Sequence, residues 1–281
     1  MLRPATAAVP AARRQPARPW RLLAPLNEPV REWAGRRVWI VGASSGIGAA
    51  LARQLGERGT RLALTARRVA PLRELLDRSR AAGLALPLDV TDAAAVADAA
   101  ARIEAEWGGI DLTIWLAGSY APMRAQDFDL AIARAMVDAN LTGVLNGLAA
   151  LIPMLRRQGH GGIALVSSVA GYRGLPKSLV YGPTKAALIN LAESLYLDMH
   201  DDGVGVWLVN PGFVNTPMTA ANDFRMPALI DPEDAARAII DGFGAGRFEI
   251  HFPRRFTVIM RLLRLLPQRL YFHAVRRFTG L

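Results

Sequence analysis

The 281-residue sequence contains no cysteine, few histidines and no long apolar run. Without cysteine the chain forms neither a disulfide bond nor a cysteine-ligated metal site, and it suits a reducing compartment, so we expect a cytoplasmic location. No uninterrupted apolar stretch reaches the roughly 18 residues that a membrane-spanning helix needs. We expect no bound metal, because the histidines are scattered without the spacing of metal ligands: His160, His200, His251 and His273.

Acidic residues are scarce only at the two ends of the chain. The net charge is +10, of which residues 1–37 carry +6 and residues 253–281, with seven arginines and no acid, carry +7. The remaining body therefore carries −3, which argues against a nucleic-acid-binding core. We expect no nucleic-acid partner. RNA association through the basic ends is a third-ranked alternative, and it predicts binding that is lost at high salt.

The N-terminal residues 1–35 favour a disordered, basic extension. They are rich in Ala, Arg and Pro, and they lack the apolar segment of a secretory signal peptide. An arginine-rich, acid-poor composition is also typical of a mitochondrial presequence. Five prolines before residue 26 oppose the continuous amphipathic helix that such a presequence forms.

The body of the chain, residues 36–252, alternates short apolar runs with helix-like segments. This alternation predicts one α/β domain, a Rossmann-like, doubly wound parallel sheet of about seven strands with helices on both faces. The expected strands are 37–42, 62–66, 84–88, 112–117, 163–167, 206–209 and 248–251. The expected helices are 46–58, 71–82, 93–107, 132–158 with a kink at Pro153, and 181–201.

A glycine-rich turn follows the first expected strand. The apolar residues 38–41 lead into Gly42, Gly46 and Gly48, and a helix-like segment comes next. Glycine lets the backbone approach a pyrophosphate, and the free N–H groups and the dipole of the following helix attract it. The turn therefore predicts a dinucleotide site.

Tyr181 and Lys185 are four residues apart, and Ser168 lies thirteen residues upstream of the tyrosine. The spacing of four places the tyrosine and the lysine on one face of a helix. A nearby ammonium favours the phenolate and lowers the tyrosine pKa from its usual value of about 10. A phenol that gains and loses a proton near neutrality is a usable acid and base.

Together these motifs resemble the short-chain dehydrogenase/reductase family, in the family's order and over about residues 36–252. The resemblance implies a catalytic tetrad of Asn140, Ser168, Tyr181 and Lys185. It also implies a set of cofactor contacts, which includes two members of the tetrad: Gly42, Ser44, Ser45, Gly46, Ile47, Gly48, Arg67, Arg68, Asp89, Val90, Ala117, Gly118, Tyr181, Lys185, Pro211, Gly212, Val214 and Thr216. Where the family usually has Asn-Asn-Ala-Gly after the fourth strand, this chain has Trp-Leu-Ala-Gly at 115–118, so the amides that brace that strand are absent.

The end of the second expected strand predicts the choice of cofactor. Rossmann enzymes that use NAD place an acid about 20 residues after the glycine turn, where it binds the ribose 2′-hydroxyl. Here that position is Ala66, and Arg67 and Arg68 follow it. A guanidinium holds a 2′-phosphate through charge-assisted hydrogen bonds, so we expect NADP(H) to be preferred over NAD(H).

The resemblance implies hydride transfer between nicotinamide and a carbonyl or alcohol carbon. In this reading Tyr181 exchanges a proton with the substrate oxygen, and Ser168 holds that oxygen. Lys185 lowers the tyrosine pKa and binds the nicotinamide ribose, while Asn140 holds a water in a proton relay. The alternative from another class is a catalytically silent dinucleotide-binding scaffold or sensor of the same fold.

The segment 218–230 is implied to build the substrate pocket, and it is largely apolar with flexible methionines. It favours a small, hydrophobic carbonyl or alcohol as substrate. We also expect a homo-oligomer.

The C-terminal segment 253–281 predicts a basic amphipathic helical tail. Polar residues at 254, 257, 261, 264 and 268 form one stripe along an otherwise largely apolar helix. Such a helix suits a membrane surface or a partner subunit, and docking onto its own domain is an equal alternative. Residues 256–266 are too few to span a bilayer.

Overall fold

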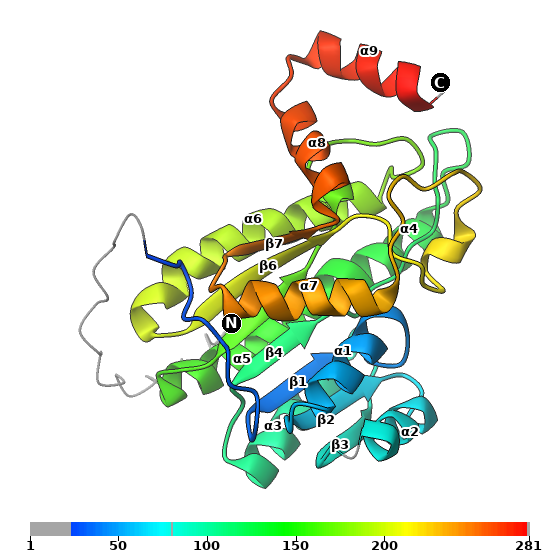
Figure 1. Ribbon diagram of the computed structural model, residues 1–281. Coiled ribbons are helices and arrows are strands. Elements are labelled where there is room, and N and C mark those ends of the chain that lie inside the picture. Colours follow the sequence, from blue (N-terminus) through cyan, green and yellow to red (C-terminus); the bar gives the residue numbers. More distant parts are fainter. Residues whose placement is uncertain (1–23, 80, 280–281) are drawn as a thin grey trace, which may run out of the picture.

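A computed structural model of the protein describes residues 24–79 and 81–279 (Figure 1). Within these residues, seven parallel strands form one sheet in the order β3-β2-β1-β4-β5-β6-β7. The strands are β1 Arg37–Val41, β2 Arg61–Ala66, β3 Gly83–Pro87, β4 Leu112–Trp115, β5 Gly162–Val166, β6 Gly205–Pro211 and β7 Glu249–Phe252. The predicted Rossmann-like doubly wound sheet is confirmed.

Helices cover both faces of the sheet, and each face has its own apolar core (Figure 1). One layer consists of α1 (Gly46–Gly56), α2 (Ala70–Ser79) and α7 (Pro232–Gly244). The other contains α3 (Ala93–Trp107), α5 (Gly143–Gln158) and α6 (Tyr181–Met199). Because both faces are buried, the central strands are continuous apolar runs rather than alternating ones. In β1, for example, residues 38–41 are all buried.

The strand order reverses between β1 and β4. The chain runs outward through β2 and β3 on one side and returns to build β4 to β7 on the other. In open α/β sheets this switch point leaves a crevice at the carboxyl ends of the strands, where ligands bind. The topology therefore places the binding site before any side chain is considered.

The expected helix 132–158 is longer and less regular than predicted. It comprises α4 (Leu130–Val137), a π-helical segment η1 (Asp138–Thr142) and α5, which continues through Pro153. The irregularity thus lies at η1, and such π-bulges are frequent at functional sites. Among the described residues this 29-residue helix alone is long and apolar enough to cross a membrane. A core helix meets the same criterion, and this one packs on the sheet, where a Cβ at Gly147 would lie 2.1 Å from the Trp115 ring.

The expected disordered extension 1–35 is wrong for its last twelve residues, and residues 1–23 lie outside the described part of the chain. Val30 and Trp33 are buried in the core that includes α7. The Asn27 side chain donates to Val206 O (2.7 Å) and accepts from Val206 N–H (3.0 Å), at the start of β6 before β7 begins to pair. The segment 24–35 is therefore part of the domain, because its few apolar and amide side chains complete the sheet and core.

The C-terminal segment forms two helices, α8 (Arg254–Arg264) and α9 (Gln268–Thr279), separated near Pro267. Both project away from the sheet in Figure 1. The expected single polar stripe is divided between environments, since Thr257 is fully buried whereas Arg254 is exposed. Part of the stripe therefore faces the protein.

Asn27→Ala should lower the free energy of unfolding by about 2–4 kcal/mol, because the buried N–H and carbonyl of Val206 would both lose their partner. Urea unfolding followed by circular dichroism measures the change. Leu26→Ala is the matched control, since that side chain is 49% exposed, and it should cost less than about 1 kcal/mol. Equal stability of the two variants would show that the segment does not support the domain.

Candidate active site

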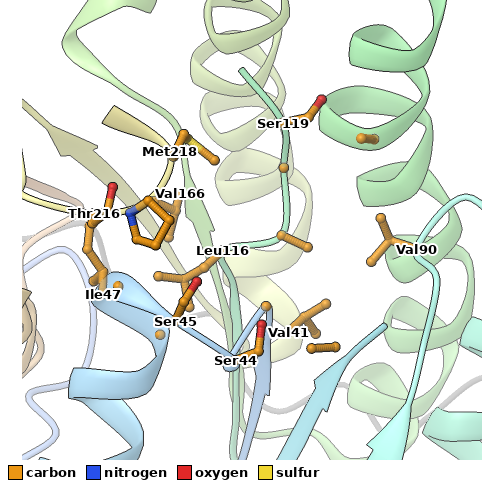
Figure 2. A pocket seen from close by; sticks show the side chains of 18 of the residues that line it. Val41, Ser44, Ser45, Ile47, Val90, Leu116, Ser119, Val166, Thr216 and Met218 are labelled. Carbon is orange, nitrogen blue, oxygen red and sulfur yellow. The ribbon is translucent and has the colours of Figure 1, made fainter. Parts of the chain in front are cut away.

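A cavity of about 960 Å³ lies at the carboxyl ends of β1, β2, β4, β5 and β6. It is lined by every predicted site residue except Asn140. Figure 2 shows Ser44, Ser45 and Ile47 at the start of α1, and Thr216 and Met218 nearby in the segment after β6. The sheet thus gathers residues from distant segments, from Val41 to Thr219, around one cavity.

The glycine turn leaves the N-terminus of α1 open to the cavity. Gly42 and Gly46 have positive φ angles of 92° and 54°, which favour glycine. A Cβ at Gly48 would lie 2.3 Å from Gly42 O, so no other residue fits without a shift. The N-cap residue Ser45 makes no side-chain capping bond to the first turn. Uncapped N–H groups and the positive end of the helix dipole suit a phosphate.

Arg67 and Arg68 extend from the end of β2 at the cavity edge and are exposed. Asp89 follows β3 on the same side, and its Oδ1 accepts from the Thr91 N–H (3.0 Å) and hydroxyl (2.8 Å). These two hydrogen bonds, with a smaller contribution from the charge of Arg67, lower the pKa of Asp89. Among these residues only Thr91 was missed in the sequence, because it belongs to no motif.

Ser168 and Tyr181 meet in the cavity. Ser168 caps the short helix η2 (Val169–Gly171), where its Oγ accepts from the Ala170 N–H at 3.1 Å. Tyr181 opens α6, and the Ser168 side chain lowers the tyrosine pKa, but burial has the larger effect and raises that pKa to about 12. The expectation of a lowered tyrosine pKa is therefore wrong for this structure.

Lys185 is buried beside Tyr181, and its ammonium is bound to the backbone. Its Nζ donates to Val166 O at 3.0 Å and lies 5.6 Å from the centroid of the Tyr181 ring. The side chain is 5% exposed, and burial lowers the lysine pKa to about 8. The ammonium is thus held by a backbone carbonyl, and burial raises the tyrosine pKa more than any neighbouring group lowers it.

Asn140 lies behind the cavity wall, within the π-helical segment η1. Its Oδ1 accepts from the Ser119 N–H (2.7 Å), and its Nδ2 donates to Ser119 O (3.0 Å) and Thr184 Oγ1 (3.1 Å). The amide is fully buried and braces the chain just after β4. It supplies part of the support that the absent Asn-Asn pair would give.

Tyr120 is the main feature of the site that the sequence did not indicate. Its ring packs edge-on against Tyr181 with centroids 4.9 Å apart, and its hydroxyl donates to Asn222 Oδ1 at 2.9 Å. Tyr120 follows the Ala-Gly turn by two residues, but Asn222 is more than 100 residues away. Pairings at that separation arise only from the fold.

The described residues contain no group of three or more His, Cys, Asp or Glu side chains placed to hold a metal ion. The cavity instead combines a phosphate-type helix terminus at one end with a hydroxyl, a phenol and an amine at the other. This combination suits an elongated cofactor and proton transfer beside it.

Comparison with known proteins places the chain in a family. The family model described as short chain dehydrogenase matches residues 36–225. A Myxococcus xanthus protein named as an uncharacterized oxidoreductase is 36% identical over 249 residues, which cover 88% of this chain and 98% of the relative. A similarly named Staphylococcus epidermidis protein is 31% identical over 72% of this chain and 87% of its own length.

The crystal structure of a short-chain dehydrogenase from Streptomyces avermitilis has the same fold, with a TM-score of 0.75 and 24% identity over 88% of this chain and 98% of that one. The chain belongs to the short-chain dehydrogenase/reductase family of oxidoreductases.

The buried lysine predicts a pH-dependent stability difference between the wild type and Lys185→Met. Between the folded pKa of about 8 and the ordinary value of 10.5, the unfolded wild-type chain binds one more proton than the folded chain. The wild-type free energy of unfolding therefore gains about 1.4 kcal/mol per pH unit in this window, and the variant does not.

We expect the stability of the variant, relative to the wild type, to fall by that slope from about pH 8 to about pH 10 in urea unfolding without cofactor. Below about pH 8 the difference should be constant. A difference that is independent of pH throughout would contradict the lowered lysine pKa.

Proposed function

We propose that the protein is an NADP-dependent oxidoreductase that interconverts a small, hydrophobic carbonyl compound and its alcohol. The observation that carries this proposal is the single cavity in which the glycine turn, Arg67, Ser168, Tyr181 and Lys185 meet. Bound NADPH would supply the hydride, and the residues of the chain would hold the substrate oxygen and exchange its proton.

The cavity fits a dinucleotide on three grounds. Glycines at 46 and 48 leave backbone room where a Cβ would clash, and the N-terminus of α1 lacks a side-chain cap. A Cβ at Gly118 would lie 2.8 Å from Asn140 Oδ1 and 3.6 Å from Lys185 Nζ, so this wall also requires glycine. These features would hold the pyrophosphate and the nicotinamide ribose.

The preference for NADP rests on the end of β2. Ala66 stands where a carboxylate would bind the ribose diol, and the two exposed arginines that follow line the same cavity. A guanidinium binds a 2′-phosphate with geometry that a lysine or a neutral group does not match. Asp89, fixed by Thr91, would receive the adenine at this end.

Proton transfer would fall to Tyr181. With pKa values of about 12 for the tyrosine and about 8 for the lysine, both side chains carry their protons at neutral pH. A protonated phenol can donate to a developing alkoxide, while the Ser168 hydroxyl stabilises the same oxygen. The protonated phenol therefore supports Tyr181 as the proton donor when a carbonyl is reduced.

The substrate side of the cavity supports a hydrophobic molecule. Pro217 and Met218 line it, and Met218 and Phe224 of the adjoining segment are partly exposed. The two ends of this segment are fixed by the bridge between Val214 and Ile230, and Lys177 binds Asp223 at its middle. These contacts hold the segment beside the cavity. Because its exposed side chains there are apolar, it favours an apolar ligand.

A turnover screen tests the proposal directly. Panels of carbonyls with NADPH or NADH, and of alcohols with NADP or NAD, should give activity that is higher with the phosphorylated cofactor. Tight NADPH binding without turnover of any substrate would instead favour the silent scaffold. The proposal includes a cytoplasmic homo-oligomer, and light scattering after size exclusion measures its oligomeric state.

Tyr181→Phe removes the transferable proton and leaves the ring. We expect turnover to fall by about 100- to 10,000-fold, the usual contribution of general acid–base catalysis, with NADPH affinity largely retained. Tyr120→Phe is the matched control, because it removes a hydroxyl from the neighbouring ring, where that hydroxyl is bonded to Asn222. It should change turnover less than about tenfold. Activity of Tyr181→Phe within a few-fold of the wild type would exclude the proposed role.

Arg67→Ala should weaken NADPH binding about tenfold to a hundredfold and leave NADH binding nearly unchanged. The lost charged hydrogen bond accounts for roughly 1.5–3 kcal/mol. Titration calorimetry with both cofactors measures the effect. Arg73→Ala on α2, outside the cavity lining, is the control. Equal weakening of both cofactors would show that Arg67 does not discriminate between them.

A further inference from the structure

Helix α8 presents its apolar side chains outward instead of toward the domain. Val258, Ile259, Leu262 and Leu265 recur at the spacing of one helix face, and they are 44–78% exposed. The opposite face contains Thr257 and Met260, which are buried. Helix α9 carries three further exposed apolar side chains, Leu270 and Phe272 on either side of the buried Tyr271, and Phe278 near its end. We call these seven exposed residues the apolar face of the tail.

Polar contacts fix α8 in this orientation. Thr257 Oγ1 lies 2.7 Å from His251 Nδ1, and Arg261 donates to His251 Nε2 at 3.3 Å. Arg261 also lies 3.5 Å from a carboxylate oxygen of Glu249. Both partners belong to β7, so Thr257 and Arg261 bind this side of the helix to the edge of the sheet. The apolar face is directed away from the domain as a consequence.

The loop after η2 fixes the junction between α8 and α9. Arg173 donates to the carbonyls of Leu263 (3.1 Å) and Leu266 (2.6 Å), and its guanidinium lies 4.0 Å from the centroid of the Tyr271 ring. The Tyr271 hydroxyl donates to Gly174 O at 2.6 Å, and this side chain is almost completely buried. Both helices are therefore attached to the body, although most of their surface projects from it (Figure 1).

The charge of the tail identifies what covers the apolar face. Residues 253–281 contain seven arginines and no acidic residue, and the arginines flank the apolar face at both ends of α8 and along α9. A twofold contact with a second copy would bring this face against itself and oppose arginine to arginine. An anionic bilayer surface offers negative charge for the arginines and an apolar layer for the exposed side chains.

We propose that α8 and α9 form a docking surface for an anionic lipid bilayer, on which the protein is peripherally bound. The helices lie in the interface with their apolar face toward the acyl chains, and the arginines contact lipid headgroups. Each helix is too short to span the hydrocarbon core. Docking of the tail does not depend on the proposed reaction, because none of the residues of α8 and α9 is assigned to that reaction.

A row of three phenylalanines links the inward side of α8 to the apolar segment that adjoins the cavity. Phe256 of α8 packs against Phe213 at 5.5 Å between centroids, and Phe213 packs against Phe224 at 5.7 Å. Phe224 belongs to the apolar segment that follows the lining residues 217–219. Docking through α8 would therefore place the bilayer on the side of the domain that carries the apolar segment beside the cavity.

Vesicle sedimentation of the full chain tests the proposal. We expect binding to vesicles of phosphatidylcholine with phosphatidylglycerol, and much weaker binding to phosphatidylcholine alone. Between 0.15 M and 1 M salt the screening length falls from about 8 Å to about 3 Å, so the electrostatic part should be lost. Equal binding to both vesicle types, or no binding to either at low salt, would overturn the proposal.

Substitutions separate the apolar contribution to vesicle binding from the electrostatic one. The triple variant Ile259→Ser, Leu262→Ser, Leu265→Ser should bind at least tenfold more weakly, because it removes apolar surface from the outward face of α8. The triple variant Arg255→Gln, Arg269→Gln, Arg277→Gln should lose roughly a hundredfold, at about fivefold per arginine.

Matched controls use exposed residues elsewhere in the chain: Leu26→Ser, Leu145→Ser, Leu197→Ser for the apolar set, and Arg73→Gln, Arg102→Gln, Arg134→Gln for the charged set. The controls should bind like the wild type. All variants replace exposed side chains, and unfolding curves verify that they fold. If the tail variants instead change the oligomeric state and leave vesicle binding unchanged, the face covers a second copy and the bilayer proposal is wrong.

Discussion

The turn after β1 passes so close to the end of β4 that a Cβ at Gly42 would lie 2.7 Å from the Ala117 nitrogen. This close backbone approach, at the point where the strand order reverses, is the constraint on which the site depends. It brings the N-terminus of α1 over the strand ends and leaves a channel between two backbones. A side chain at Gly42 would push the turn away from the end of β4, and one at Gly48 would push α1 away from the turn, so either would displace the N–H groups that suit a phosphate.

The catalytic end of the cavity depends on buried polar groups that are held by the backbone. The Lys185 ammonium is bound to Val166 O, and the Asn140 amide is bound to both backbone groups of Ser119. Both residues are at least 95% buried, so moving either one would leave a polar group without water or a partner. The wall of the cavity is rigid for that reason, even though this chain lacks the pair of asparagines usual after the fourth strand.

The parallel strands, the helices on both faces and the glycine turn could be predicted from the sequence, because apolar runs and glycine spacing are local signals. The other cavity-lining residues were implied by the resemblance to the family. The cavity collects all the predicted residues but Asn140, whose amide faces the loop after β4 instead. Its position depends on the π-helical segment η1, and no local pattern in the sequence indicates that irregularity.

The expected disorder before β1 and the expected low tyrosine pKa are both wrong because of burial. The composition of residues 1–35 suggests disorder, yet Asn27 and Trp33 are buried because the start of β6 and the core beside α7 need partners that no nearer segment supplies. The tyrosine pKa was predicted from one charge, whereas burial affects both the phenol and the lysine. Burial is a property of the whole fold, and spacing along a helix does not reveal it.

Burial of the Lys185 ammonium lowers the stability of the folded domain, while the proposed reaction would use its charge. Lowering the lysine pKa to about 8 corresponds to about 3 kcal/mol of unfavourable free energy at neutral pH, a large fraction of the stability of an ordinary domain. Methionine would fill the same space without that penalty, so packing alone does not account for the lysine. A charged group at this position would serve two purposes, since it could hold the nicotinamide ribose and stabilise charge that develops on the neighbouring phenol. The destabilising residue therefore lies where the proposed reaction would use its charge.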